Sequence, residues 1–128
     1  MMRTIVIILF IFWLAGCSSS VENQIKAEKP KELEVTIESD PKQVQINEKV
    51  TFTSTVKYGN EDISKDAEVM FEVIENGMSY GNLPIEPSAN GTYQLELKFS
   101  EPGEHQVIAH VSYKDLHEMP ILPFQVTQ

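Results

Sequence analysis

The chain has 128 residues, with 19 acidic and 10 basic side chains and a formal net charge of −9. This length fits one domain of ordinary size and excludes a large multidomain enzyme. The acidic excess disfavours nucleic acid as a partner, because such a chain repels phosphate backbones. Hydrophobic residues make up 41% of the chain but crowd into its first 16 positions.

The amino terminus has the proportions of an export signal. Arg3 precedes an uninterrupted apolar run at residues 5–14, and Leu14-Ala15-Gly16-Cys17 follows. A membrane-spanning helix needs roughly 20 apolar residues, so an uncleaved anchor is the weaker alternative. The sequence Leu14-Ala15-Gly16-Cys17 resembles the bacterial lipobox, whose cysteine receives a diacylglycerol before cleavage on its amino side. We therefore expect residues 1–16 to be a cleaved lipoprotein signal peptide.

The single cysteine, Cys17, cannot form an intramolecular disulfide, and lipidation is the economical explanation for it; the alternative is an ordinary thiol in an export leader. Two or more acyl chains on one residue give stable membrane anchoring. Residues 17–32 are polar and aperiodic, which predicts a flexible tether. We expect the domain to be held by its lipid on the extracytoplasmic side of the cell membrane.

From residue 33 onward, apolar and polar residues alternate with the period of a β-strand. Gly81 and Pro84 lower the expectation for a seventh strand at residues 78–85. Tyr93 follows a tight turn, either as a tyrosine corner or as a packing aromatic, and is buried in both interpretations. We predict an immunoglobulin-like antiparallel β-sandwich of about seven strands over residues 33–128. The six clearer strands are predicted at residues 33–38, 50–56, 69–74, 93–99, 107–113 and 121–126.

The order and spacing of several short segments resemble the YtkA-like (FixH-like) domain of bacterial envelope proteins, over roughly Leu33 to Gln128. This resemblance implies a small extracytoplasmic sandwich without established catalytic activity. One branch of the family is associated with a cation pump and cytochrome oxidase assembly, and the lipobox departs from that branch. The segments are Asp66-Ala67-Glu68-Val69-Met70-Phe71, Asn90-Gly91-Thr92-Tyr93, Pro102-Gly103-Glu104-His105 and His117-Glu118-Met119-Pro120.

Histidines and methionines are the candidate metal ligands. Imidazole with thioether is a ligand set that copper favours. Because Val107, Ala109 and Val111 should face the core, His110 points to the other face, as Met70 does in its own strand. A site of His110, His117 and Met119, with His105 or Met70 as further ligands, is one hypothesis; histidines on a solvated strand face are the alternative.

No arrangement typical of catalysis is recognisable. The chain has no G-x-S-x-G motif, and its acidic residues are scattered along the strand edges. We expect a non-catalytic lipoprotein, without a cofactor, that binds another envelope protein through a sheet edge or loop end. The alternative function is the handling of copper or another metal by the surface His and Met ligands.

Overall fold

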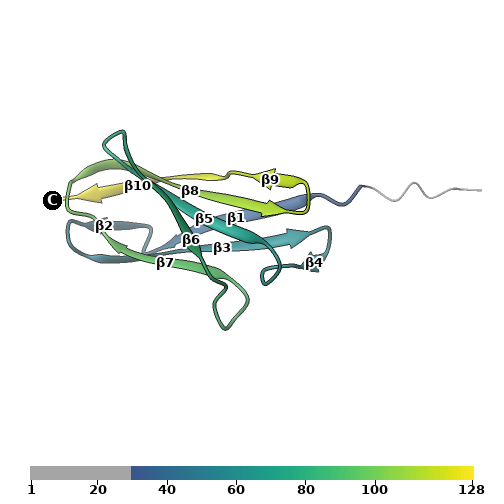
Figure 1. Ribbon diagram of the computed structural model, residues 1–128. Helices are drawn as coiled ribbons and strands as arrows, with labels where there is room; N and C mark the ends of the chain where they lie inside the picture. Colours follow the sequence, from purple (N-terminus) through teal and green to yellow (C-terminus); the bar gives the residue numbers. More distant parts are fainter. Residues whose placement is uncertain (1–29) are drawn as a thin grey trace, which may run out of the picture.

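The computed structural model describes residues 30–128 (Figure 1). The predicted signal peptide, Cys17 and the tether up to residue 29 lie outside the described residues. Within residues 30–128 the regular structure is entirely β, and no helix there is long and apolar enough to cross a membrane. The strands are β1 (Leu33–Asp40), β2 (Gln43–Gln45), β3 (Lys49–Tyr58), β4 (Glu61–Asp62), β5 (Glu68–Glu75), β6 (Met78–Ile85), β7 (Tyr93–Lys98), β8 (Gly103–Tyr113), β9 (Leu116–Glu118) and β10 (Ile121–Thr127).

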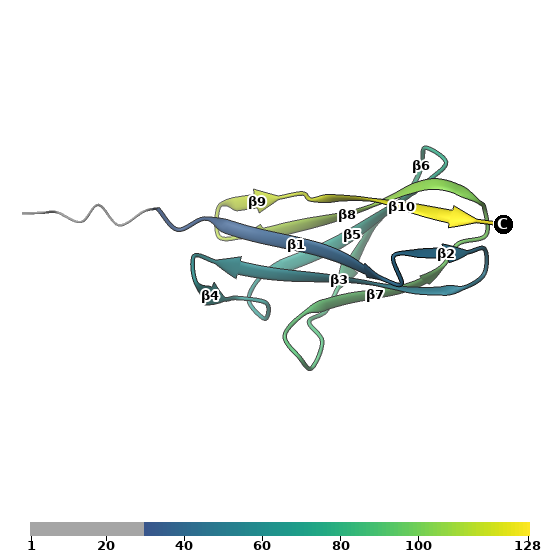
Figure 2. The same ribbon diagram turned by 180° about the vertical axis from the view of Figure 1, so that it is seen from behind.

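The strands form two sheets packed face to face (Figures 1 and 2). In the smaller sheet, β3 pairs with β1 on one side and with β7 and the short β4 on the other. The larger sheet has the order β2-β10-β8-β5-β6, and β9 pairs with the end of β8. All neighbours are antiparallel except β2 and β10, which run parallel. This arrangement is the predicted immunoglobulin-like β-sandwich.

The seven long strands confirm the predicted strand number. They are β1, β3, β5, β6, β7, β8 and β10. The doubtful segment 78–85 forms β6, an edge strand that tolerates Pro84 because only one of its sides pairs with a neighbour. The three short strands β2, β4 and β9 have two or three residues each, too few for a visible alternation.

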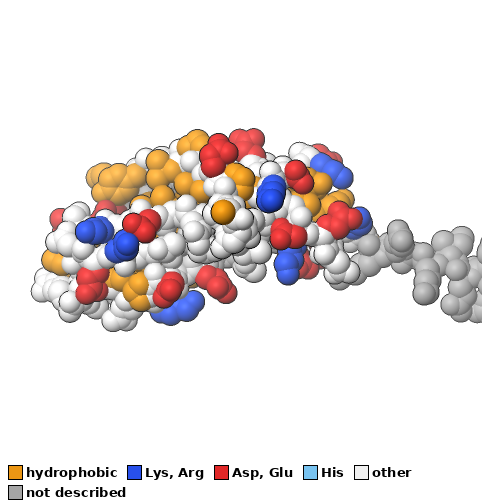
Figure 3. Space-filling model, turned by 90° about the horizontal axis from the view of Figure 1, so that it is seen from below, with side chains coloured by type: hydrophobic (Ala, Val, Ile, Leu, Met, Phe, Trp, Pro, Cys, Tyr) orange, Lys and Arg blue, Asp and Glu red, His pale blue; other side chains and the backbone are white. Residues whose placement is uncertain are grey.

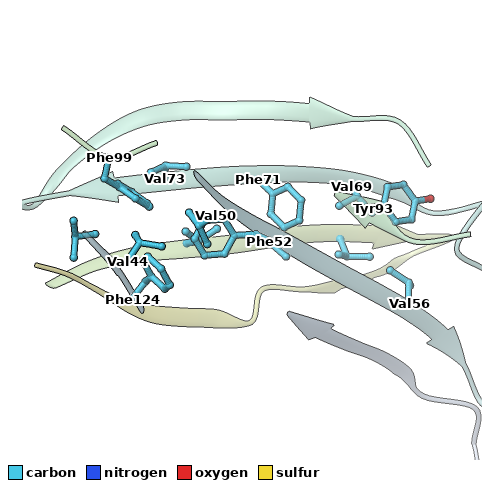
Figure 4. Close-up of a cluster of buried hydrophobic side chains, with 14 of the residues drawn as sticks. Val44, Val50, Phe52, Val56, Val69, Phe71, Val73, Tyr93, Phe99 and Phe124 are labelled. Carbon is cyan, nitrogen blue, oxygen red and sulfur yellow. The ribbon is translucent and has the colours of Figure 1, made fainter. Parts of the chain in front are cut away.

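Aromatic rings fill the space between the sheets (Figure 4). The Phe52 ring meets Phe124 edge to face, with ring centroids 5.2 Å apart. Tyr93 is fully buried, and its hydroxyl donates a 2.7 Å hydrogen bond to the carbonyl oxygen of Ala67. This bond reaches from β7 to the segment before β5, so it ties the two sheets together and is not the local bond of a tyrosine corner.

The outer faces of the two sheets differ in chemistry. Alternation along β5 and β8 buries odd-numbered residues such as Val69 and Val107 and turns even-numbered residues outward. The outer face of the larger sheet therefore combines apolar side chains with histidines. The outer face of the smaller sheet is polar, with Glu34, Thr36, Glu38, Thr51, Thr53, Thr55, Lys57, Gln94 and Glu96.

Candidate functional site

His110 and His117 are brought together on the outer face of the larger sheet. Ser112 of β8 lies opposite His117 of β9, and His110 is two residues before Ser112 on the same face. The imidazole ring centroids of His110 and His117 are 6.1 Å apart. We call this group, with Met70, Glu72, Ser112 and Met119, the histidine cluster.

A carboxylate holds the imidazole of His110. His110 Nε2 lies 2.8 Å from Glu72 Oε2, and Glu72 in turn accepts a 2.7 Å hydrogen bond from the Ser79 hydroxyl. These two bonds, with Ser79 the larger influence, hold the pKa of Glu72 below its ordinary value. Since an ionised carboxylate only accepts, His110 donates through Nε2–H, which leaves the lone pair on Nδ1.

His117 is held in a similar way by a hydroxyl. Its Nδ1 lies 2.8 Å from Ser112 Oγ. The side chain is exposed, so its second nitrogen can reach solvent. Both imidazoles of the cluster are therefore oriented through one nitrogen by a neighbouring oxygen.

The two candidate thioethers lie on either side of the histidines. Met70 of β5 is directly opposite His110 of β8 in the strand register and is half-buried. Met119 follows His117 by two residues, and 49% of its surface is exposed. Between them they supply a sulfur ligand from β5 and another from the segment joining β9 to β10.

His105, predicted as a further ligand, lies on the opposite face of β8, inside the core. It is 1% exposed and stacks on Phe99 at a centroid distance of 5.1 Å. Its Nδ1 accepts a hydrogen bond from the Asn76 backbone N–H, and its Nε2 donates to the Glu101 carbonyl oxygen at 2.8 Å. With both nitrogens engaged and its ring buried, His105 serves the packing of the loop ends and does not join the histidine cluster.

Glu72 and Ser112 are parts of the site that the sequence did not predict. Glu72 is 38 residues from His110, and only the pairing of β5 with β8 brings them together. Ser112 meets His117 across the tight β8–β9 turn at residues 114–115, which is a local signal. Among residues 30–128, no group of three or more His, Cys, Asp and Glu side chains is placed to hold a metal ion.

Comparison with protein families gives one match. The family model described as YtkA-like matches residues 27–110, which is more than half of the chain. None of the curated proteins compared with the chain matches it.

Solved structures of other proteins resemble the fold, among them two with TM-scores just above 0.5. One is the soluble domain of PmoD from Methylocystis sp. ATCC 49242 (Rockwell), with a TM-score of 0.51 and 12% identity over 75% of this chain and 91% of that one. The other is the CARDB domain of the PF1109 protein from Pyrococcus furiosus, in complex with di-metal ions. Its TM-score is 0.52, with 17% identity over 76% of this chain and 94% of that one. At these identities the likeness concerns the β-sandwich fold alone.

Proposed function

The chain belongs to the YtkA-like family, and from this premise we propose that it is a lipid-anchored binding module of the bacterial cell envelope. In this proposal residues 1–16 are removed, Cys17 carries the lipid, and the sandwich faces the extracytoplasmic side. The module has no catalytic activity and acts by binding another envelope protein. The lipobox sequence Leu14-Ala15-Gly16-Cys17 supports the anchoring.

The observation that carries the binding role is the distribution of exposed hydrophobic side chains. In the described part of the chain, all five large exposed hydrophobic residues belong to the larger sheet or to the segment that joins its strands β9 and β10. In Figure 3, hydrophobic side chains gather at the upper left, while acidic side chains interrupt the upper border near its middle. Exposed apolar side chains are typical of a surface that contacts a partner. Three of the five residues lie on the edge strand β6, and the other two lie on the far side of β5 and β8, at or just before the start of β10. The residues are Met78, Tyr80, Leu83, Met119 and Ile121.

The direction of the chain fits anchoring at one end of the sandwich. β1 begins at Leu33 at one end of the molecule, and the carboxyl terminus lies at the opposite end (Figures 1 and 2). A tether of about 15 residues spans roughly 20 Å, by the scaling of flexible linkers. The domain then lies close to the membrane surface. A neighbouring membrane protein can there contact the side chains of the larger sheet.

Photo-crosslinking in cells tests the anchoring and the binding face together. A benzophenone amino acid is placed at Leu83 on the larger sheet or at Thr53 on the polar face, each in the natural chain and in a Cys17→Ser chain. We expect the natural chain in the membrane fraction, with a discrete crosslinked product from position 83 and none from position 53. We expect Cys17→Ser to lose lipid labelling and to weaken that product severalfold.

Two results would contradict the proposal. Lipid labelling retained in the Cys17→Ser chain would remove the assignment of the anchor. Equal crosslinking from positions 53 and 83 would remove the assignment of the binding face. Ser18→Ala is the matched control for the anchor, because it changes the neighbouring residue without removing the thiol.

A further inference from the structure

We propose that the histidine cluster binds one Cu(I) ion, with the imidazoles of His110 and His117 and the thioethers of Met70 and Met119 as its ligands. This goes beyond the proposed function, because it assigns a bound metal ion to the larger sheet. The assignment depends neither on the lipid nor on the protein partner.

One nitrogen on each imidazole of the cluster is available to a metal ion. Nε2 of His110 is occupied by Glu72, and Nδ1 of His117 by Ser112. The other two nitrogens make no hydrogen bond to any residue in the range 30–128. Metal-binding histidines are characteristically held in this manner, with one nitrogen on the metal and the other on a carboxylate, carbonyl or water.

The spacing of the two imidazole rings fits one shared ion. An imidazole nitrogen bonds a metal ion at about 2 Å, so the ring centres of two histidines sharing one ion lie roughly 5–6.5 Å apart. The ring centroids of His110 and His117 are 6.1 Å apart, and the ring planes are inclined by 37°. One ion between the two side chains therefore requires no change in the β8–β9 pairing.

The types of ligand in the cluster select the metal. A site of three or more carboxylate, imidazole or thiolate ligands is not formed within residues 30–128, which disfavours Zn²⁺ and Ca²⁺. The side chains that complete the cluster are thioethers, since Met70 lies opposite His110 and Met119 is two residues after His117. Thioether and imidazole together favour Cu(I), which accepts a small number of soft ligands.

The exposure of the cluster fits an exchangeable ion. The His110 side chain is 13% exposed and anchored by Glu72, whereas His117 and Met119 are exposed. One half of the cluster is thus fixed in the sheet, and the other half is open to solvent. Such a site can receive Cu(I) from a donor and pass it on without opening the sandwich.

A Cu(I) titration of the full chain, purified in detergent without oxygen, tests the proposal. A chromogenic Cu(I) chelator competes for the ion and reports both stoichiometry and affinity. We expect one Cu(I) per chain and a sulfur shell in the X-ray absorption spectrum. His117→Gln and Met119→Leu should each weaken binding at least tenfold, and the absorption spectrum of Met119→Leu should lose part of its sulfur shell.

Two controls make the result specific. Met78→Leu removes an exposed methionine of β6 that is outside the cluster, and should leave the affinity unchanged. Cys17→Ser removes the only thiol and should also keep the affinity. The proposal is overturned if no Cu(I) binds more tightly than about micromolar, if the cluster variants bind as the natural chain does, or if Cys17→Ser abolishes binding. Since the titration needs neither lipid nor partner, its failure would not affect the proposed function.

Discussion

Two polar side chains in the core are retained because each satisfies a backbone group that packing has removed from water. His105 pairs with the Asn76 N–H and the Glu101 carbonyl, and Tyr93 pairs with the Ala67 carbonyl. A buried backbone group without a partner costs about 1–3 kcal/mol. These residues therefore fix the loops that join the strands, a role that differs from that of the solvent-facing His110 and His117.

Replacing Tyr93 by Phe tests this role at neutral and alkaline pH. The loss of the hydroxyl leaves the Ala67 carbonyl unpaired, so we expect the free energy of unfolding at pH 7 to fall by about 1–3 kcal/mol. Burial, with the nearby charge of Asp66, raises the pKa of Tyr93 above its ordinary value of 10.0. The folded state then disfavours the phenolate, and the stabilisation that is complete below about pH 10 is lost as pH rises through the folded pKa.

The difference in free energy of unfolding between the natural chain and Tyr93→Phe should therefore shrink above about pH 10. Urea unfolding at a series of pH values measures this difference. Tyr113→Phe is the control, because its hydroxyl makes no hydrogen bond to the residues described. Its effect should stay within about 0.5 kcal/mol. A Tyr93→Phe chain as stable as the natural one at pH 7 would contradict the assigned role.

At the scale of elements, alternation was sufficient to predict the long strands but not their neighbours. Runs such as 50–56 bury every second residue in a single sheet face, and the structure places them as predicted. The strand β2 buries only Val44, and its partner β10 lies about 80 residues away, so no local pattern reveals it. Sequence periodicity indicates which face a side chain occupies, whereas strand order depends on the packing of the whole sandwich.

The same distinction between local periodicity and strand order explains which residues of the site could be predicted. Alternation placed His110 and Met70 on an outer face, and the structure confirms that they are opposite each other in the register. His105 shares its parity with Val107, which predicts an inward side chain and opposes the metal-ligand role that its imidazole suggests. The contact of Glu72 with His110 requires the β5–β8 pairing, so it could not be predicted.

The edge strand β6 carries features that oppose pairing with a second sheet. It has no charged residue, yet it contains Pro84, and the positive φ of Gly81 falls at the register shift against β5. Proline and bulges protect sheet edges from edge-to-edge association. The exposed side chains of β6 are therefore presented for contact while its backbone is kept from adding a strand.

A substitution that restores the backbone N–H at position 84 should remove the protection that the proline gives to the edge of β6. We expect Pro84→Val to raise self-association at least tenfold, measured by sedimentation equilibrium over a range of concentrations. Pro84→Lys is the matched control, because it also restores the N–H but adds the charge that edge strands use against pairing. If Pro84→Val and Pro84→Lys remain equally monomeric, the edge is protected by something other than the proline.

At the scale of the molecule, the sandwich extends beyond the region that the family model covers. The match ends at residue 110, inside β8, but β10 supplies Phe124 and Val126 to the core. β10 also pairs with β8 on one side and with β2 on the other. Without β10, the inner residues of β8 and the ring of Phe52 would be exposed to water.

We therefore predict that a chain ending at residue 113 does not fold, although it contains the whole family match. Loss of Phe124 alone removes about 3–5 kcal/mol, by the usual cost of deleting a buried phenylalanine. That is a large part of the 5–15 kcal/mol that stabilises a typical domain. Circular dichroism and urea unfolding should show no cooperative transition for this chain, whereas removal of the exposed Gln128 alone should leave the transition unchanged. A cooperative transition in the shortened chain would mean that β1 to β8 form a stable sandwich unaided, because the larger sheet would then hold without its β10 strand.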